Sequence, residues 1–160
     1  MSTQAIPAVG AQYLGFQVAE EEYAIEILRV REILEYDTLT RLPNTPPSVR
    51  GVFNLRGRVV PVLDLAVKLG RDASPITKRS CVVVVEAHFA GRPTVMGVLA
   101  DAVSEVLHLP ASELEPPPAF GARVGADCLL GLGRAGRRLV LVLDIDKLLA
   151  TDRAEGAPLR

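Results

Sequence analysis

A loose internal repeat runs through this chain and limits the folds open to it. At a shift of eighty positions, Gly51–Leu69 matches Gly131–Leu149, and Val62-Leu63-Asp64-Leu65 falls on Val142-Leu143-Asp144-Ile145. At a shift of seventy-three, Tyr23-Ala24-Ile25 and Val30–Leu34 fall on Met96-Gly97-Val98 and Val103–Leu107. Because the two matches keep the same order and differ only in loop length, they predict two small lobes of similar topology.

The residues within each copy indicate β-structure, because stretches rich in Val, Leu and Ile are bounded by Gly, Pro or Asp. We predict strands at Tyr13–Val18, Arg58–Leu65, Ser80–Ala87, Thr94–Leu99 and Arg138–Ile145. Short helices are expected near Ile27–Leu34, after Leu65, and near Asp146–Ala150 with Asp144 or Asp146 as N-cap. The predicted fold class is therefore mainly all-β, with paired small β-barrels and a few short helices.

One domain accounts for most of the chain. Residues 1–11 and 151–160 lack periodicity and carry small, polar or turn-forming residues, so we expect flexible ends around a domain at 12–150. A hydrophobic content of 49% is enough for a sizeable core.

Charge and hydropathy exclude several kinds of partner. The 18 Lys and Arg residues nearly balance 19 Asp and Glu residues, which offers no electrostatic footprint for nucleic acid or an acidic membrane surface. No apolar run approaches the roughly 18 residues that span a bilayer, so no membrane insertion is expected. Cys81 and Cys128 each open an apolar stretch and are interpreted as small buried hydrophobes, in agreement with a reducing cytoplasm.

Several patterns imitate the chemistry of enzymes. Gly131–Gly136 fits a dinucleotide-binding fingerprint, but the strand-like Arg137–Leu143 follows it where a helix is needed, so we predict a hairpin turn. Asp144 and Asp146 are interpreted as capping residues because no third metal ligand is near them. His88 and His108 have no nucleophile motif beside them. We expect no catalytic activity, no cofactor and no metal.

Two proline-containing segments suit contact with a partner. Arg41–Arg50 holds three prolines, and Ala111–Asp127 holds three in succession, so both are expected to be stiff and exposed. Arg56 follows the first segment and lies beside Gly57, which indicates a position at a hairpin tip or lobe junction. Two interpretations of Arg56 stay open: recognition of a partner, or an internal salt bridge that braces the turn.

The block Leu42–Leu65, with Asn54-Leu55-Arg56-Gly57 intact, resembles the CheW family. The resemblance runs from Tyr13 to Leu149 and includes Tyr23-Ala24-Ile25, Val30–Leu34, Gly97–Val106, Pro118-Ala119-Phe120 and Leu130–Gly133. It implies two intertwined SH3-like five-stranded β-barrels, in agreement with the repeat. It also implies a cytoplasmic scaffold, recruited to chemoreceptor arrays beneath the inner membrane, that binds the regulatory domain of the histidine kinase CheA and the cytoplasmic hairpin tip of chemoreceptors.

The same resemblance implies three sets of contact residues. The receptor-binding set is Val30, Glu32, Ile33, Arg56, Val103 and Val106. The kinase-binding set is Thr40, Arg41, Leu42 and Gly51, with Gly51 expected in a tight turn, and a second kinase or ring contact lies at Phe120. Composition alone would place the three valines in the core.

Two other functions remain as alternatives. One is a CheW-like adaptor of a non-flagellar pathway, for surface sensing, twitching or gene control. The other is a small hydrolase or nucleotide-binding protein built on paired barrels, which a search for bound nucleotide or metal would test.

Overall fold

A computed structural model describes residues 12–116 and 128–148 of the chain. The strands in these residues are β1 Gln12–Val18, β2 Glu21–Glu26, β3 Val30–Glu35, β4 Val49–Leu55, β5 Arg58–Asp64, β6 Cys81–Phe89, β7 Arg92–Ala100, β8 Ala102–His108, β9 Leu129–Ala135 and β10 Arg138–Leu143. Short helical turns lie between the strands at η1 Ile27–Arg29, α2 Leu65–Lys68 and η2 Ala111–Glu113, and another follows β10 at residues 145–148.

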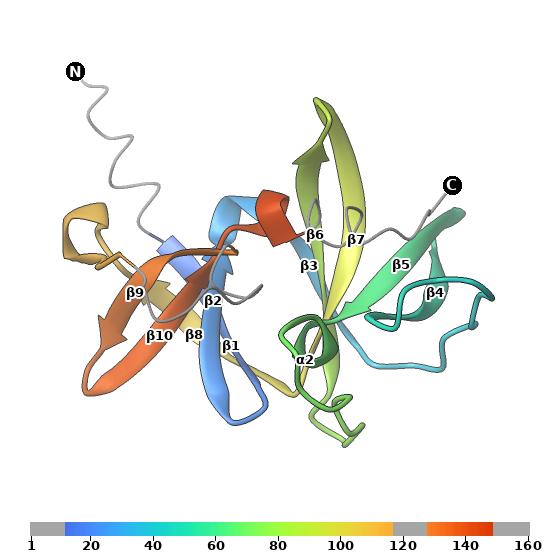
Figure 1. Cartoon of the computed structure of the whole chain (residues 1–160), viewed down its shortest axis with the longest axis horizontal. Coiled ribbons are helices and arrows are strands. Elements are labelled where there is room, and N and C mark those ends of the chain that lie inside the picture. Colours follow the sequence, from blue (N-terminus) through green and yellow to red (C-terminus); the bar gives the residue numbers. More distant parts are fainter. Residues whose placement is uncertain (1–11, 117–127, 149–160) are drawn as a thin grey trace.

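The strands form two five-stranded sheets, which lie side by side as two lobes (Figure 1). One sheet has the order β8-β1-β2-β10-β9 and is called here the β1 lobe. The other has the order β3-β6-β7-β5-β4 and is called the β5 lobe. Neighbouring strands are antiparallel except for β2 with β10 and β5 with β7. The predicted all-β class with a few short helices is confirmed.

The sequence repeat corresponds to the strand order. The first copy supplies β1 to β5 and the second supplies β6 to β10, and β3, β4, β5 and β7 match β8, β9, β10 and β2 in their sheet positions. Each sheet contains strands of both copies, since the β1 lobe takes β1 and β2 from the first copy and β8, β9 and β10 from the second. The two lobes are therefore intertwined.

Three apolar clusters fill the described part of the molecule. The largest joins both sheets and includes the fully buried Phe16, Ile25, Leu63 and Val83. The two smaller clusters belong to one lobe each, around Val140 and Val142 in the β1 lobe and around Val62 and Val84 in the β5 lobe. Because the largest cluster is shared, the lobes are expected to unfold together.

The predicted helix near Ile27–Leu34 is wrong. Only Ile27–Arg29 forms a 3-10 turn, and Val30–Glu35 is the edge strand β3, paired with β6. Along β3, half-buried and exposed residues alternate, which is the period of a strand rather than of a helix. The prediction missed this alternation.

Other local predictions are confirmed. Asp64 and Asp144 match in the repeat and each caps a short helix: Asp64 Oδ1 accepts from Ala66 N at 3.1 Å, and Asp144 Oδ1 from Lys147 N at 3.1 Å. The glycine-rich stretch lies in the hairpin of β9 and β10 and is not followed by a helix. Both cysteines are buried free thiols.

Candidate partner-binding surfaces

The predicted receptor-binding residues lie mainly on β3 and β8, which are matching edge strands of the two sheets and do not pair with each other. Val30 and Val103 are half-buried and pack against the shared core. Ile33 and Val106, which match at a shift of seventy-three, are 45% and 55% exposed. Each strand therefore has one apolar residue that supports the fold and another that is free to contact a partner.

Arg56 lies at the tip of the hairpin between β4 and β5. Arg56 and Gly57 both have positive φ values, 50° and 88°, which define the tight two-residue turn, and Asn54 Oδ1 accepts from Gly57 N at 2.7 Å. Glycine suits this geometry, whereas arginine adopts it at a cost. The turn therefore fixes the backbone position from which the Arg56 side chain extends.

The guanidinium of Arg56 forms an ion pair with the carboxylate of Glu32 on β3. The Arg56 side chain is still 71% exposed and that of Glu32 is 26% exposed. An ion pair as exposed as this contributes at most about 1 kcal/mol to stability. The pair thus connects the hairpin to the edge strand, which agrees with the interpretation of Arg56 as part of an internal salt bridge. The guanidinium of Arg56 still has N–H donors that face solvent, so it can also contact a partner.

A second charged group occupies the matching place in the β1 lobe. Arg138 lies 3.3 Å from Glu105 and also forms an ion pair with Glu22, whose side chain is 7% exposed. Ser104 donates to Glu22 at 3.1 Å. Sequence reasoning missed this group, although Glu105 matches Glu32 at a shift of seventy-three and could have been found from the repeat.

The predicted kinase-binding residues come together in the β5 lobe. Thr40 and Val52 form a bridge, with reciprocal N–H to carbonyl hydrogen bonds of 2.9 and 2.8 Å. Arg41 and Leu42 follow on the surface, and Leu42 is 45% exposed. Phe120 lies outside the described residues.

The predicted tight turn at Gly51 is wrong. Gly51 lies within β4 at a φ of 154°, and a Cβ placed there would come within 2.7 Å of the carbonyl oxygen of Thr40. Gly131, its match in the repeat, approaches the carbonyl oxygen of Glu115 in the same way, at 2.8 Å. The glycine is required because a neighbouring backbone lies against the strand.

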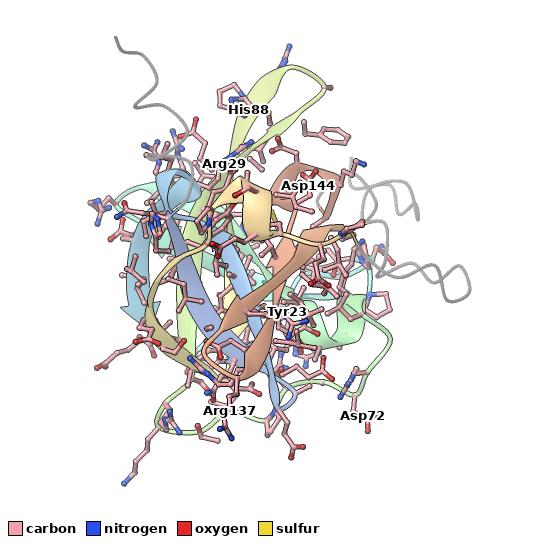
Figure 2. All side chains as sticks on the ribbon, turned by 90° about the vertical axis from the view of Figure 1, so that its left-hand side faces the viewer. Tyr23, Arg29, Asp72, His88, Arg137 and Asp144 are labelled. Atoms are coloured by element: carbon pink, nitrogen blue, oxygen red, sulfur yellow. The ribbon has the colours of Figure 1, made fainter. Side chains whose placement is uncertain are left out.

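A further set of residues joins the two lobes. Arg29 in η1 donates to both carboxylate oxygens of Asp146, at 3.0 and 2.8 Å, and to the carbonyl oxygen of Glu86 at 3.3 Å. Asp146 also accepts from the backbone N–H of His88 at 2.7 Å. Figure 2 shows Arg29 and His88 close together at one end of the molecule, and in Figure 1 the short helix at 145–148 lies between the lobes.

The electrostatics of this contact favour the carboxylate form of Asp146. Burial alone would raise the pKa of Asp146, but the backbone N–H of His88 and the guanidinium of Arg29 outweigh burial, so the pKa lies below its usual range. Asp146 thus makes an interlobe contact instead of capping the helix.

The described residues contain no arrangement typical of a metal centre, since no three His, Cys, Asp or Glu side chains are grouped to hold an ion. Within the same residues, no helix is long and apolar enough to cross a membrane.

Comparison with known proteins identifies the family. Residues 12–153 match the model of the CheW-like domain. The chain belongs to the CheW family. It is 41% identical to the chemotaxis protein CheW of Klebsiella aerogenes over 144 residues, which cover 90% of this chain and 84% of that protein. It is 33% identical to the CheW of Helicobacter pylori over 141 residues, covering 88% of this chain and 82% of that protein.

A solved structure extends the likeness to three dimensions. The scaffolding protein CheW of Thermoanaerobacter tengcongensis superposes with a TM-score of 0.77 at 27% identity, over 87% of each chain. This match confirms the predicted two-lobed CheW fold. CheW relatives of this chain are thus chemotaxis and scaffolding proteins by name, and the family assignment predicted from the sequence is confirmed.

Proposed function

We propose that this CheW-family protein couples the cytoplasmic tips of chemoreceptors to the histidine kinase CheA, without performing a reaction itself. In this account the protein lies in the cytoplasm at receptor arrays. One surface binds the receptor tip and another binds the regulatory domain of the kinase.

The exposed Glu32–Arg56 pair, on an edge strand that also exposes the apolar side chain of Ile33, is the observation that carries the proposal. A receptor tip is a helical hairpin, and an amphipathic helix binds by placing apolar side chains on an apolar surface. Ile33 and Val106 are apolar side chains that stay exposed, one on each of the two edge strands. The charges of Glu32 and Arg56 would then set the register of the helix, because each can pair with an opposite charge on the receptor.

Strand β4 connects the proposed receptor and kinase surfaces. Gly51 and Val52, in the middle of the strand, pack against Thr40, and its last residue leads into the turn at Arg56. Arg56 lies five positions after Gly51, a distance of roughly 16 Å along an extended strand. The two partners could therefore bind the same lobe at neighbouring places, and a shift at one could be transmitted along one strand. The contact predicted at Phe120 stays a prediction.

Isothermal titration of the purified protein with the regulatory domain of CheA tests the kinase half of the proposal. We expect saturable, equimolar binding. A second titration, with a receptor-tip fragment added to the preformed complex, should give further heat, since the two surfaces do not overlap. Absence of binding to the kinase domain, at concentrations well above micromolar, would contradict the proposal.

A further inference from the structure

A pocket lies beneath the proline loop of the β5 lobe, next to the proposed kinase surface. Its volume is about 410 Å³, which is enough for a side chain of a binding partner. The loop contributes Arg41 and Leu42 to its lining, β4 contributes Arg50, and the segment after α2 contributes Ser74. We call this the loop pocket.

A buried aspartate, Asp64, holds two residues that line the loop pocket, Arg50 and Ser74. Asp64 is fully buried and accepts from Arg50 at 2.7 Å and from the backbone N–H of Ser74 at 3.1 Å. Arg50 also donates to the carbonyl oxygen of Ser74 at 3.0 Å. The backbone N–H and carbonyl of Ser74 are therefore both held by hydrogen bonds to the Arg50–Asp64 ion pair.

The side chain of Ser74 has an unused hydrogen-bonding group. Ser74 is only 5% exposed, and no group in the described chain forms a hydrogen bond with its Oγ. A buried hydroxyl without a hydrogen-bond partner lowers the stability of the folded state by about 1–3 kcal/mol, and such groups are rare in folded proteins. A ligand group entering the loop pocket could accept a hydrogen bond from this hydroxyl, because Ser74 lines the pocket.

The loop pocket is basic in a chain whose net charge is close to zero. Arg41 and Arg50 line it, and no Asp or Glu does. Arg50 is paired with Asp64, whereas Arg41 is exposed and has no ion-pair partner among the residues that the structure describes. Asp72, two residues before Ser74, does not line the pocket. The complementary ligand group is therefore an anion that accepts hydrogen bonds, and a protein partner supplies one as the carboxylate of Asp or Glu.

The internal repeat shows that the fold itself does not require this arrangement. Leu130 stands in the second copy where Arg50 stands in the first, and Leu130 is 44% exposed. Asp144 still caps its helix there, in the same way as Asp64. The cap therefore forms with or without the arginine, and Arg50 is a feature of the β5 lobe alone.

We propose that the loop pocket receives an acidic side chain of the kinase regulatory domain, whose carboxylate pairs with Arg41 and accepts a hydrogen bond from the Ser74 hydroxyl. The inference rests on the proposed function, and it adds the chemistry of the contact. A carboxylate that pairs with arginine and accepts from a hydroxyl gains two charge-assisted hydrogen bonds, which are the stronger kind. Leu42, at the rim, would cover the contact.

Titration of the CheA regulatory domain with single-residue variants tests the inference. Arg41→Glu should weaken binding at least about tenfold, because it places a like charge opposite the carboxylate, and Arg41→Lys should keep part of the affinity. Ser74→Ala should weaken binding about three- to tenfold through the lost hydrogen bond, while its thermal stability stays equal or rises. Arg92→Glu, an exposed charge change in the hairpin of β6 and β7, is the control and should bind like the unchanged protein.

The outcomes separate the inference from the proposed function. If the unchanged protein binds the kinase domain and both Arg41→Glu and Ser74→Ala bind equally well, the inference is wrong and the kinase function stands. The same conclusion follows if Arg92→Glu weakens binding as much as Arg41→Glu, since the effect would then reflect overall charge. If the unchanged protein does not bind, the proposed function fails and the inference fails with it.

Discussion

Arg29 and Asp146 are 117 positions apart in the chain, yet two hydrogen bonds join the guanidinium of one to the carboxylate of the other. Arg29 lies where the chain crosses from β2 in one lobe to β3 in the other, and Asp146 follows β10. His88 and Glu86 of β6 contribute backbone groups to the same cluster. The pair therefore fixes one end of the interface between the lobes.

Replacing Arg29 should destabilise the protein and loosen the lobes. Arg29→Ala removes the partner of a half-buried carboxylate and should lower the free energy of unfolding by about 1 kcal/mol, measured by urea denaturation at pH 7. Arg31→Ala, which removes a more exposed ion pair with Glu86, is a matched control and should cost less. Equal losses for the two variants would contradict a special role for Arg29.

The contribution of Asp146 should depend on pH in a defined direction. Its folded pKa lies below the unfolded value of about 3.9, so its stabilising effect is present above that pH and is lost as the pH falls through the folded pKa. Asp146→Asn should therefore be less stable than the unchanged protein at pH 7, and the difference should shrink toward pH 3. Urea denaturation at the two pH values measures this. A difference that grew on acidification would contradict the assigned contact.

Gly51→Ala and Gly57→Ala should differ in cost, although both glycines have positive φ. At Gly57 nothing lies within 4 Å of an added Cβ, so only backbone strain of about 1 kcal/mol is expected. At Gly51 the Cβ would meet the carbonyl oxygen of Thr40 at 2.7 Å, so the cost should be larger, about 2–3 kcal/mol, and kinase binding should weaken. Thermal unfolding and titration together test this, and equal costs would contradict the close approach.

Exchanging the charges of Glu32 and Arg56 separates the two roles of that pair. Arg56→Ala should change stability by less than about 1 kcal/mol and weaken receptor-tip binding about tenfold. The double variant Glu32→Arg with Arg56→Glu can re-form the internal ion pair, but it reverses the charges shown to the receptor. We expect its receptor binding to stay weak.

Two controls accompany the charge exchange. Arg58→Ala removes a charge from the same hollow, which Arg31, Glu32 and Arg56 also line, and should have a smaller effect. If the double variant instead binds the receptor like the unchanged protein, Arg56 acts only by bracing the hairpin.

Polar substitution of the exposed apolar residues on β3 and β8 should affect binding and not folding. Ile33→Ser and Val106→Ser remove side chains that are 45% and 55% exposed, so stability should change by less than about 1 kcal/mol. Receptor-tip binding should fall in a pull-down assay. Val59→Ser, at a valine that is 65% exposed on β5, is the control and should bind normally.

The repeat in the sequence predicted the lobes, because matching copies of Gly51–Leu69 and Gly131–Leu149 imply matching units. It did not show that each sheet would take strands from both copies, since that depends on pairs such as β1 with β8 that have no signature in either segment. The exchange of strands between the two lobes was predicted only from the resemblance to the CheW family.

Strands with mixed burial were the hardest to predict. The exposed positions of β3 and β8 hold both polar and apolar residues, and β4 and β9 contain glycines that lie against a neighbouring backbone. Their strand propensities therefore look weak in isolation. The interlobe pair of Arg29 and Asp146 could not be predicted either. Its two residues meet only because the crossing from β2 to β3 passes the helix that follows β10.

Kinase assays with reconstituted receptor tips test the central claim, coupling, most directly. CheA autophosphorylation is measured with receptor-tip assemblies, with and without this protein. We predict that receptor control of the kinase appears only when the protein is present and is lost with Arg56→Glu. Receptor control that is equally strong without the protein, or that is unaffected by the Arg56 variant and by loss of kinase binding, would contradict the account.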